Sequence, residues 1–264
     1  MISIHFYIDD QKHEAPKSWS DVTFDKFLRY FDKVAAHEPE VLKKFIEKHY
    51  EAISGLEEGL NQEEKEAQAQ ALFMERWNAL SWKEQKECYD FFALDVSYWC
   101  NVSAKDLQTS LDKDVLFAAF WALQVQMNPD NAKVNEDYTG FAIDGVEYLL
   151  PAKHMEGSTV EEFSSAAQFQ ENMNHLKGGH WRSMLDVMTV LCRPKGELYN
   201  YDKMFVATRK NLFRRLPMTD VINVAFFLLR LNDTLKNTLL IYTAQQELER
   251  TNKKSLAIAT DGLP

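Results

Sequence analysis

Two short stretches of similar pattern decide the fold: ISIHFYIDDQKHEAP at residues 2–16 and FAIDGVEYLLP at residues 141–151. In each stretch, apolar and polar residues alternate up to a turn, and the chain then returns to a proline. This period of two is typical of a strand with one buried face. Proline ends the return strand because it has no N–H group to donate to a sheet. Both stretches therefore predict a β-hairpin.

The two expected turns differ in residue type. In the first stretch we expect a turn over residues 9–12 and a short return strand at residues 13–15. In the second stretch Asp144-Gly145 stands between alternating apolar residues, which is a strong signal for a two-residue hairpin turn.

A capped helix with an aromatic residue in its first turn is expected after each proline. Ser20 or Asp21 can cap the first of these helices. Thr159 and Glu162 form a capping box for the second. The sequence thus predicts two modules of the same local fold, near residues 2–31 and 141–169.

The rest of the chain favours helices. Only 9 Gly and 7 Pro occur in 264 residues, too few for an all-β fold with frequent turns. Ser81 with Glu84 forms another capping box, and Thr219 is expected to cap a long final helix. Residues 193–196 predict a turn before a basic helix at about 202–215. We predict an α+β fold that is predominantly α-helical.

Polar residues between Asn128 and Asp137 mark the predicted domain boundary. Residues 1–131 would form the first hairpin-plus-helices module, with an acidic insertion near residues 55–70 that is either an exposed helix or a mobile connection. Residues 138–250 would form the second module. Residues 251–264 are expected to be a flexible tail.

Charge and composition restrict the function classes. The net charge of -10 repels phosphate backbones, which disfavours nucleic-acid binding except through the local basic helix. The longest apolar run, residues 224–229, is far short of the roughly 20 residues that span a bilayer. The N-terminus has no signal-peptide character. We therefore expect a soluble, cytoplasmic protein without a membrane span.

No motif for catalysis, cofactor binding or metal binding is apparent. The three cysteines Cys88, Cys100 and Cys192 have no metal-ligand spacing and lie in apolar surroundings. The seven histidines are scattered, and only His175 and His180 flank a glycine pair. Isolated acids within apolar helices, such as Asp95 and Asp186, fit buried polar partners better than general bases. We expect no catalytic residues, cofactors or metals.

The basic helix is the first candidate partner-binding segment. It carries Lys203, Arg209, Arg214 and Arg215 in an otherwise acidic chain. The plain interpretation is a solvated helix face. The alternative is a docking surface for an acidic partner, such as the Glu-rich stretch of a neighbouring copy, with DNA contact as a weaker option.

The final helix is the second candidate. Its first half is apolar over much of its circumference, which is typical of a core helix. Further along, Leu235, Leu239 and Tyr242 form a single stripe that could bind another chain.

From Asp137 onward the sequence resembles proteins of tailed bacteriophages, in the class of tail assembly chaperones and small morphogenesis proteins. The resemblance rests on short motifs: Leu149-Leu150-Pro151, TVEEF at 159–163, MLDVM at 184–188, VLCRPKGE at 190–197 and Leu216-Pro217-Met218. It implies a non-enzymatic protein that contacts other phage structural proteins and copies of itself. Its location would be the host cytoplasm during assembly, or the virion.

The acidic insertion departs from the small size of most tail chaperones, which leaves room for a component or cargo protein packaged in the virion. A cytoplasmic helical adaptor or regulator unrelated to phages is the alternative function. An enzyme is the third hypothesis, and the lack of clustered acid, base and nucleophile motifs disfavours it.

Overall fold

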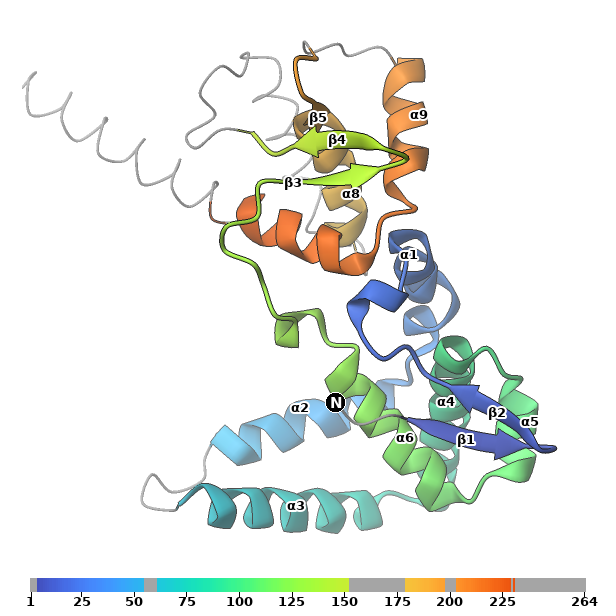
Figure 1. The fold of residues 1–264 in the computed structure, drawn as a ribbon. Helices are drawn as coiled ribbons and strands as arrows, with labels where there is room; N and C mark the ends of the chain where they lie inside the picture. The colour runs from blue at the N-terminus through green and yellow to red at the C-terminus, as the bar shows by residue number, and fades with distance from the viewer. Residues whose placement is uncertain (1–3, 55–60, 152–178, 198–202, 229, 231–264) are drawn as a thin grey trace, which may run out of the picture. The chain divides into compact units, whose positions relative to one another are not determined.

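The computed structural model describes residues 4–54, 61–151, 179–197, 203–228 and 230 of the chain (Figure 1). These residues form two compact units, the first up to Ala132 and the second from Lys133 onward. Both units combine helices with one small antiparallel sheet. The predicted fold class, a predominantly helical α+β fold, is confirmed.

The first unit opens with the predicted hairpin. Strands β1 (His5–Ile8) and β2 (Gln11–Glu14) pair antiparallel, with Phe6 opposite His13. The turn contains only Asp9 and Asp10, both with positive φ (48° and 61°). The expected four-residue turn was therefore wrong, because aspartate tolerates the left-handed backbone that a tight hairpin needs.

Helix α1 (Phe24–Lys33) follows the hairpin, and its cap differs from the prediction. Thr23 is the N-cap, with its hydroxyl accepting a 3.2 Å hydrogen bond from the backbone N–H of Lys26. Ser20 and Asp21 belong instead to a short 3-10 turn, Trp19–Asp21. The carboxylate of Asp21 accepts the backbone N–H groups of Lys17 and Ser18, just before that turn, so it is not free to cap α1.

The described residues of the first unit form five further α-helices: α2 (Glu40–Ser54), α3 (Gln62–Ala79), α4 (Trp82–Cys100), α5 (Ala104–Ser110) and α6 (Lys113–Gln126). The predicted capping box of Ser81 and Glu84 at the start of α4 is confirmed. The part of the acidic insertion from Gln62 onward is helical, with Asn61 as the N-cap. Residues 55–60 lie outside the described chain.

The core of the first unit lies between α4 and α6 and is aromatic. Phe92 of α4 stacks on Phe120 of α6 with ring centroids 4.0 Å apart, and both side chains are fully buried. Trp77, at the end of α3, stacks on Phe92 at 5.8 Å. Aromatic pairs of this kind add stability beyond the area they bury, by about 1 kcal/mol each.

The second unit contains a three-stranded sheet in the order β3 (Gly140–Ile143), β4 (Val146–Leu149), β5 (Arg193–Pro194). The predicted Asp144-Gly145 turn is confirmed, with both residues at positive φ (51° and 78°). Arg193 and Pro194 were predicted as part of a turn. They instead pair with Leu149 and Tyr148. The turn begins one residue later than predicted, at Pro194, whose carbonyl accepts the N–H of Glu197 at 3.0 Å.

The described part of the second unit also contains three helical segments: α8 (Gly179–Leu191), α9 (Lys203–Phe213) and residues 218–228. Phe213 of α9 meets Phe141 of β3 and Tyr148 of β4 edge to face, with ring centroids 5.2 and 5.0 Å apart. The last helix begins at Met218, not after a Thr219 cap. In its first turn, the N–H groups of Asp220 and Val221 both donate to the carbonyl of Pro217. The predicted helix capped by Thr159 and Glu162 and the stretch beyond residue 230 lie outside the described residues.

Candidate protein-binding site

Helices α2 and α3 run side by side in the first unit (Figure 1). Apolar side chains at helical spacing hold them together. Phe45 of α2 meets Phe73 of α3 edge to face with ring centroids 4.9 Å apart, and it meets Trp77 at 5.6 Å. We call this helical pair, residues 40–54 and 61–79, the arm.

The first groove on the arm lies between α2, α3 and α6 and has a volume of about 500 Å³. We call it the aromatic groove, because most of its walls are aromatic or aliphatic side chains. It is lined by Phe45, Ile46, His49, Tyr50, Ile53, Phe73, Phe117, Ala118, Trp121 and Val125. Tyr50 and Val125 are 68% and 67% exposed. Apolar surface of this kind is typical of a protein-binding face.

Two polar atoms in the walls of the aromatic groove have no hydrogen-bond partner among the described residues. They are Nε1 of Trp121 and Nδ1 of His49, and both are buried. Burial and the nearby Arg76 cation lower the pKa of His49, so the neutral ring is favoured at neutral pH. The groove is therefore uncharged and suited to apolar side chains of a partner.

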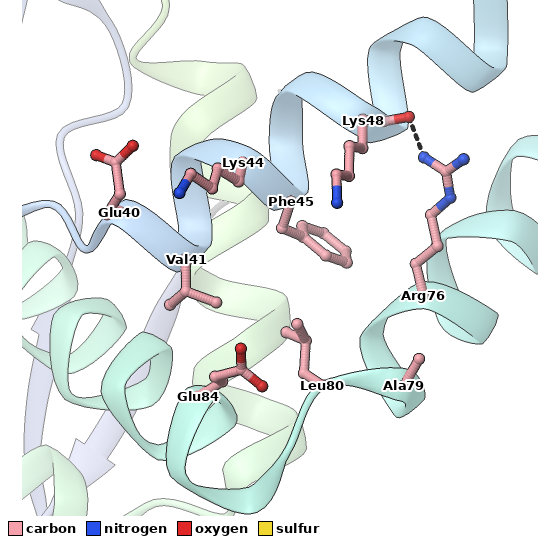
Figure 2. A pocket seen from close by; sticks show the side chains of 9 residues that line it. All are labelled: Glu40, Val41, Lys44, Phe45, Lys48, Arg76, Ala79, Leu80 and Glu84. Carbon is pink, nitrogen blue, oxygen red and sulfur yellow. Dashed lines mark hydrogen bonds between the residues drawn. The ribbon is translucent and has the colours of Figure 1, made fainter.

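A second groove of about 510 Å³ lies on another side of α2 (Figure 2). Its lining residues are Glu40, Val41, Lys44, Phe45, Lys48, Arg76, Ala79, Leu80 and Glu84. We call it the basic groove, after its three cations. The guanidinium of Arg76 donates to the backbone carbonyl of Lys48, which joins α3 to α2.

The predicted basic helix is placed in the second unit, and most of its cations hold that unit together. Arg209 is only 7% exposed, donates to the carbonyl of Thr189 at 3.3 Å and pairs with the carboxylate of Glu197. Its guanidinium lies 4.4 Å from the centroid of the Phe205 ring. Burial and these contacts give the Arg209 side chain a structural place in the second unit, and its predicted docking role stays a prediction.

The other predicted partner-binding residues differ in their placement. Lys210 of the same helix pairs with Asp186, which is therefore a structural acid. Arg215 holds both carboxylate oxygens of Asp144 at 2.7 and 2.8 Å, and Arg214 is exposed. The remaining predicted residues cannot be placed: the side chain of Lys203 and the residues Leu235, Leu239 and Tyr242 lie outside the described structure.

Sequence reasoning did not identify either groove. The apolar spacing of α2 indicates a core-facing helix. The Glu-rich composition before and at the start of α3 indicates an exposed helix or a mobile connection, and neither pattern predicts a groove. The signal available in the sequence was Tyr50, a large aromatic residue directly after His49, which the structure then shows to be exposed. Finding the grooves required knowing that α2 pairs with α3 and that α6 closes one side.

Within the described ranges, no group of three or more His, Cys, Asp or Glu side chains is arranged to hold a metal. His154 and His175 fall outside those ranges, and the side chain of His180 is not described. No helix in the described part of the chain has the length and apolarity to cross a membrane.

Comparison of the chain with protein-family models found no matching family. Comparisons with curated proteins and with solved structures likewise found no match. The grooves and the sequence motifs therefore carry the functional argument.

Proposed function

We propose that this protein is a non-enzymatic phage assembly or structural protein that acts through protein–protein contacts. It either chaperones a tail component or is built into, or packaged within, the virion. The sequence motifs between Leu149 and Met218 support the phage class, and the aromatic groove supports action by contact.

The aromatic groove is the single observation on which the contact role depends. It exposes Tyr50 and Val125 beside the aromatic core of the first unit, so a partner could bury apolar area without unfolding anything. Burial of apolar surface contributes about 25 cal/mol per Å², which makes such a face a natural anchor for another chain.

Mass spectrometry of purified particles tests the assignment and separates its two forms. A virion component or cargo protein would be present in finished particles. A tail chaperone would be absent from them but would bind a tail protein when the two are produced together. Absence from particles, combined with no binding to any particle protein, would contradict the proposal and favour the cellular adaptor.

A matched pair of substitutions on α6 tests the role of the groove. Val125→Glu places a charge in the aromatic groove, whereas Val115→Glu makes the same change at a half-exposed site on the same helix outside it. We expect Val125→Glu to weaken incorporation or tail-protein binding at least about tenfold, because a buried unpaired carboxylate is costly. Equal behaviour of the two variants would mean that the groove is not the contact face.

A further inference from the structure

The basic groove presents two lysines without ion-pair partners among the described residues. Lys44 and Lys48 are both exposed and stand four residues apart, on one face of α2. Arg76, facing them from α3, uses its guanidinium on a backbone carbonyl and not on a carboxylate. Figure 2 shows the Lys48 ammonium and the Phe45 ring turned toward the space that the labelled residues surround.

The two carboxylates of the basic groove do not neutralise these cations. Glu40 pairs with Lys43 at 3.3 Å. Glu84 accepts the backbone N–H and the hydroxyl of Ser81 at 2.8 and 2.6 Å, and these hydrogen bonds lower the pKa of Glu84. The groove is therefore a local excess of positive charge in a chain whose net charge is -10.

Below the cations the groove is apolar. Val41, Phe45 and Leu80 line it, and Phe45 is only 5% exposed. A matching ligand combines carboxylates, which attract Lys44 and Lys48, with an aliphatic side chain that covers the apolar residues.

The chain itself contains a segment of this chemistry. Residues 56–64 read LEEGLNQEE, with two leucines and four glutamates. Between residues 51 and 70 there are six glutamates and one lysine. This composition is complementary to the groove in both charge and apolar content.

Along the chain, the acidic segment follows the C-terminal end of α2, whereas most residues of the basic groove belong to the N-terminal half of that helix. Ser54, the last residue of α2, lies ten residues after Lys44 and six after Lys48, which corresponds to about 15 and about 9 Å along the helix. Its last residues, 61–64, are the cap and the first turn of α3, whereas Arg76 lies near the other end of that helix. The groove and the acidic segment therefore belong to opposite ends of the arm.

We infer that the basic groove binds the acidic segment 56–64 of a second copy of this chain. Two arms packed antiparallel satisfy both contacts at once, because each copy offers its acidic end to the basic groove of the other. This is an isologous, two-fold contact that closes as a dimer. The inference rests on the proposed function, since it supplies the self-contact that an assembly protein acting in multiple copies requires.

Charge exchange on the full chain tests this contact. Lys44→Glu/Lys48→Glu makes the groove acidic, and Glu57→Lys/Glu58→Lys makes the segment basic. Each variant alone opposes like charges, so we expect its dimer dissociation constant to rise at least about tenfold. Mixed one to one, the two variants should recover a heterodimer, because both of its contacts are again attractive.

Light scattering with size-exclusion chromatography gives the mass, at about 50 mM and about 500 mM NaCl. The wild-type dimer should weaken at the higher salt, because exposed charges are screened. Lys105→Glu/Lys113→Glu, which makes the same charge change at exposed sites on α5 and α6, should dimerise like the wild type. Circular dichroism verifies that all variants are folded.

Two results would overturn the inference. One is a wild-type monomer at every concentration and salt. The other is a charge-exchanged mixture that does not recover the dimer. In that case, loss of binding to a different acidic protein by Lys44→Glu/Lys48→Glu would show that the groove binds another partner. Particle mass spectrometry is independent of both results, so the self-contact can fail while the proposed function stands, and the reverse also holds.

Discussion

The hydroxyl of Tyr30 donates a 2.7 Å hydrogen bond to the carboxylate of Asp95, and this contact joins α1 to α4 inside the first unit. Gln124 of α6 donates to the same oxygen at 3.2 Å, so three helices meet at one acid. Asp95 is fully buried, and its other oxygen has no partner among the described residues. A carboxylate in this position is costly unless it is protonated.

We predict that Asp95 makes the first unit less stable as pH rises. Burial raises the pKa of Asp95 to about 7, against the lowering effect of the hydrogen bonds from Tyr30 and Gln124, and the nearby Glu38 carboxylate raises it further. Because the folded pKa lies above the unfolded value of 3.8, the folded state holds the proton more tightly. The stabilising effect of the protonated Asp95 is complete below pH 4 and is lost by about pH 7. Over this range the free energy of unfolding falls by up to roughly 1.4 kcal/mol per pH unit.

Chemical denaturation of the wild type and of Asp95→Asn at pH 5, 6, 7 and 8 measures this effect. The asparagine variant cannot ionise, so its free energy of unfolding should gain on that of the wild type from pH 5 to pH 7 and then run parallel. Glu87→Gln, an exposed change on the same helix, should keep the wild-type profile. Parallel profiles for Asp95→Asn and the wild type throughout would show that Asp95 has an ordinary pKa in the fold.

The second prediction concerns two glycines of the second unit. A Cβ atom at Gly140 would lie 2.2 Å from the backbone carbonyl oxygen of Tyr148, so Gly140→Ala must separate β3 from β4 locally. At Gly145, φ is +78° but no atom lies within 4 Å, so alanine there meets backbone strain alone. We expect Gly140→Ala to cost about 3 kcal/mol and Gly145→Ala about 1 kcal/mol. Denaturation curves measure both, and an equal or reversed order would contradict the paired geometry.

Local chemistry explains which parts of this fold are predictable. The Asp144-Gly145 turn and the capping box of Ser81 and Glu84 depend on neighbours within four residues, and both are present as predicted. The Asp9-Asp10 turn was misplaced, because aspartate adopts positive φ less readily than glycine and the pattern of residues 9–12 fits a longer turn equally well.

The ion pairs of the basic residues and the two grooves depend on contacts between elements distant in the sequence, so the sequence did not predict them. The cations near α9 form a basic helix in the sequence, yet their acids come from elsewhere: Glu197, Asp186 and Asp144 belong to three other segments. The pairing of α2 with α3, which forms the sides of both grooves, leaves no signature in either helix alone. From the sequence alone, cations that pair with acids inside the unit therefore look the same as cations that would bind a partner.

The third prediction is that the three cysteines are chemically inert in the folded protein. Burial raises the pKa of Cys88, Cys100 and Cys192 to about 12 each, so almost no thiolate forms at neutral pH. A thiol-specific reagent should label them only slowly in the native protein and completely after unfolding. Ser110→Cys adds one exposed thiol as a control, and it should react at once. Fast native labelling of all three cysteines would contradict their burial.

The last prediction separates a structural role from a docking role for the predicted basic residues. Removing one partner of a buried ion pair costs about 3–5 kcal/mol, because the other charge stays behind. Arg209→Ala leaves the carboxylate of Glu197, which is 26% exposed, without its cation, so the second unit should lose a large part of its stability. Arg215→Ala breaks a pair whose side chains are 60% and 54% exposed, so it should cost no more than about 1 kcal/mol.

Thermal unfolding of both variants, together with a measurement of their binding to a partner protein, distinguishes the roles. A structural Arg209 lowers the unfolding midpoint, and Arg209→Lys restores part of the loss because it keeps the charge. A docking Arg209 would instead leave the midpoint unchanged while binding falls. Because its guanidinium lies against Phe205 and bonds Thr189 within the unit, we expect the midpoint to move first, and any loss of binding by Arg209→Ala to follow from unfolding.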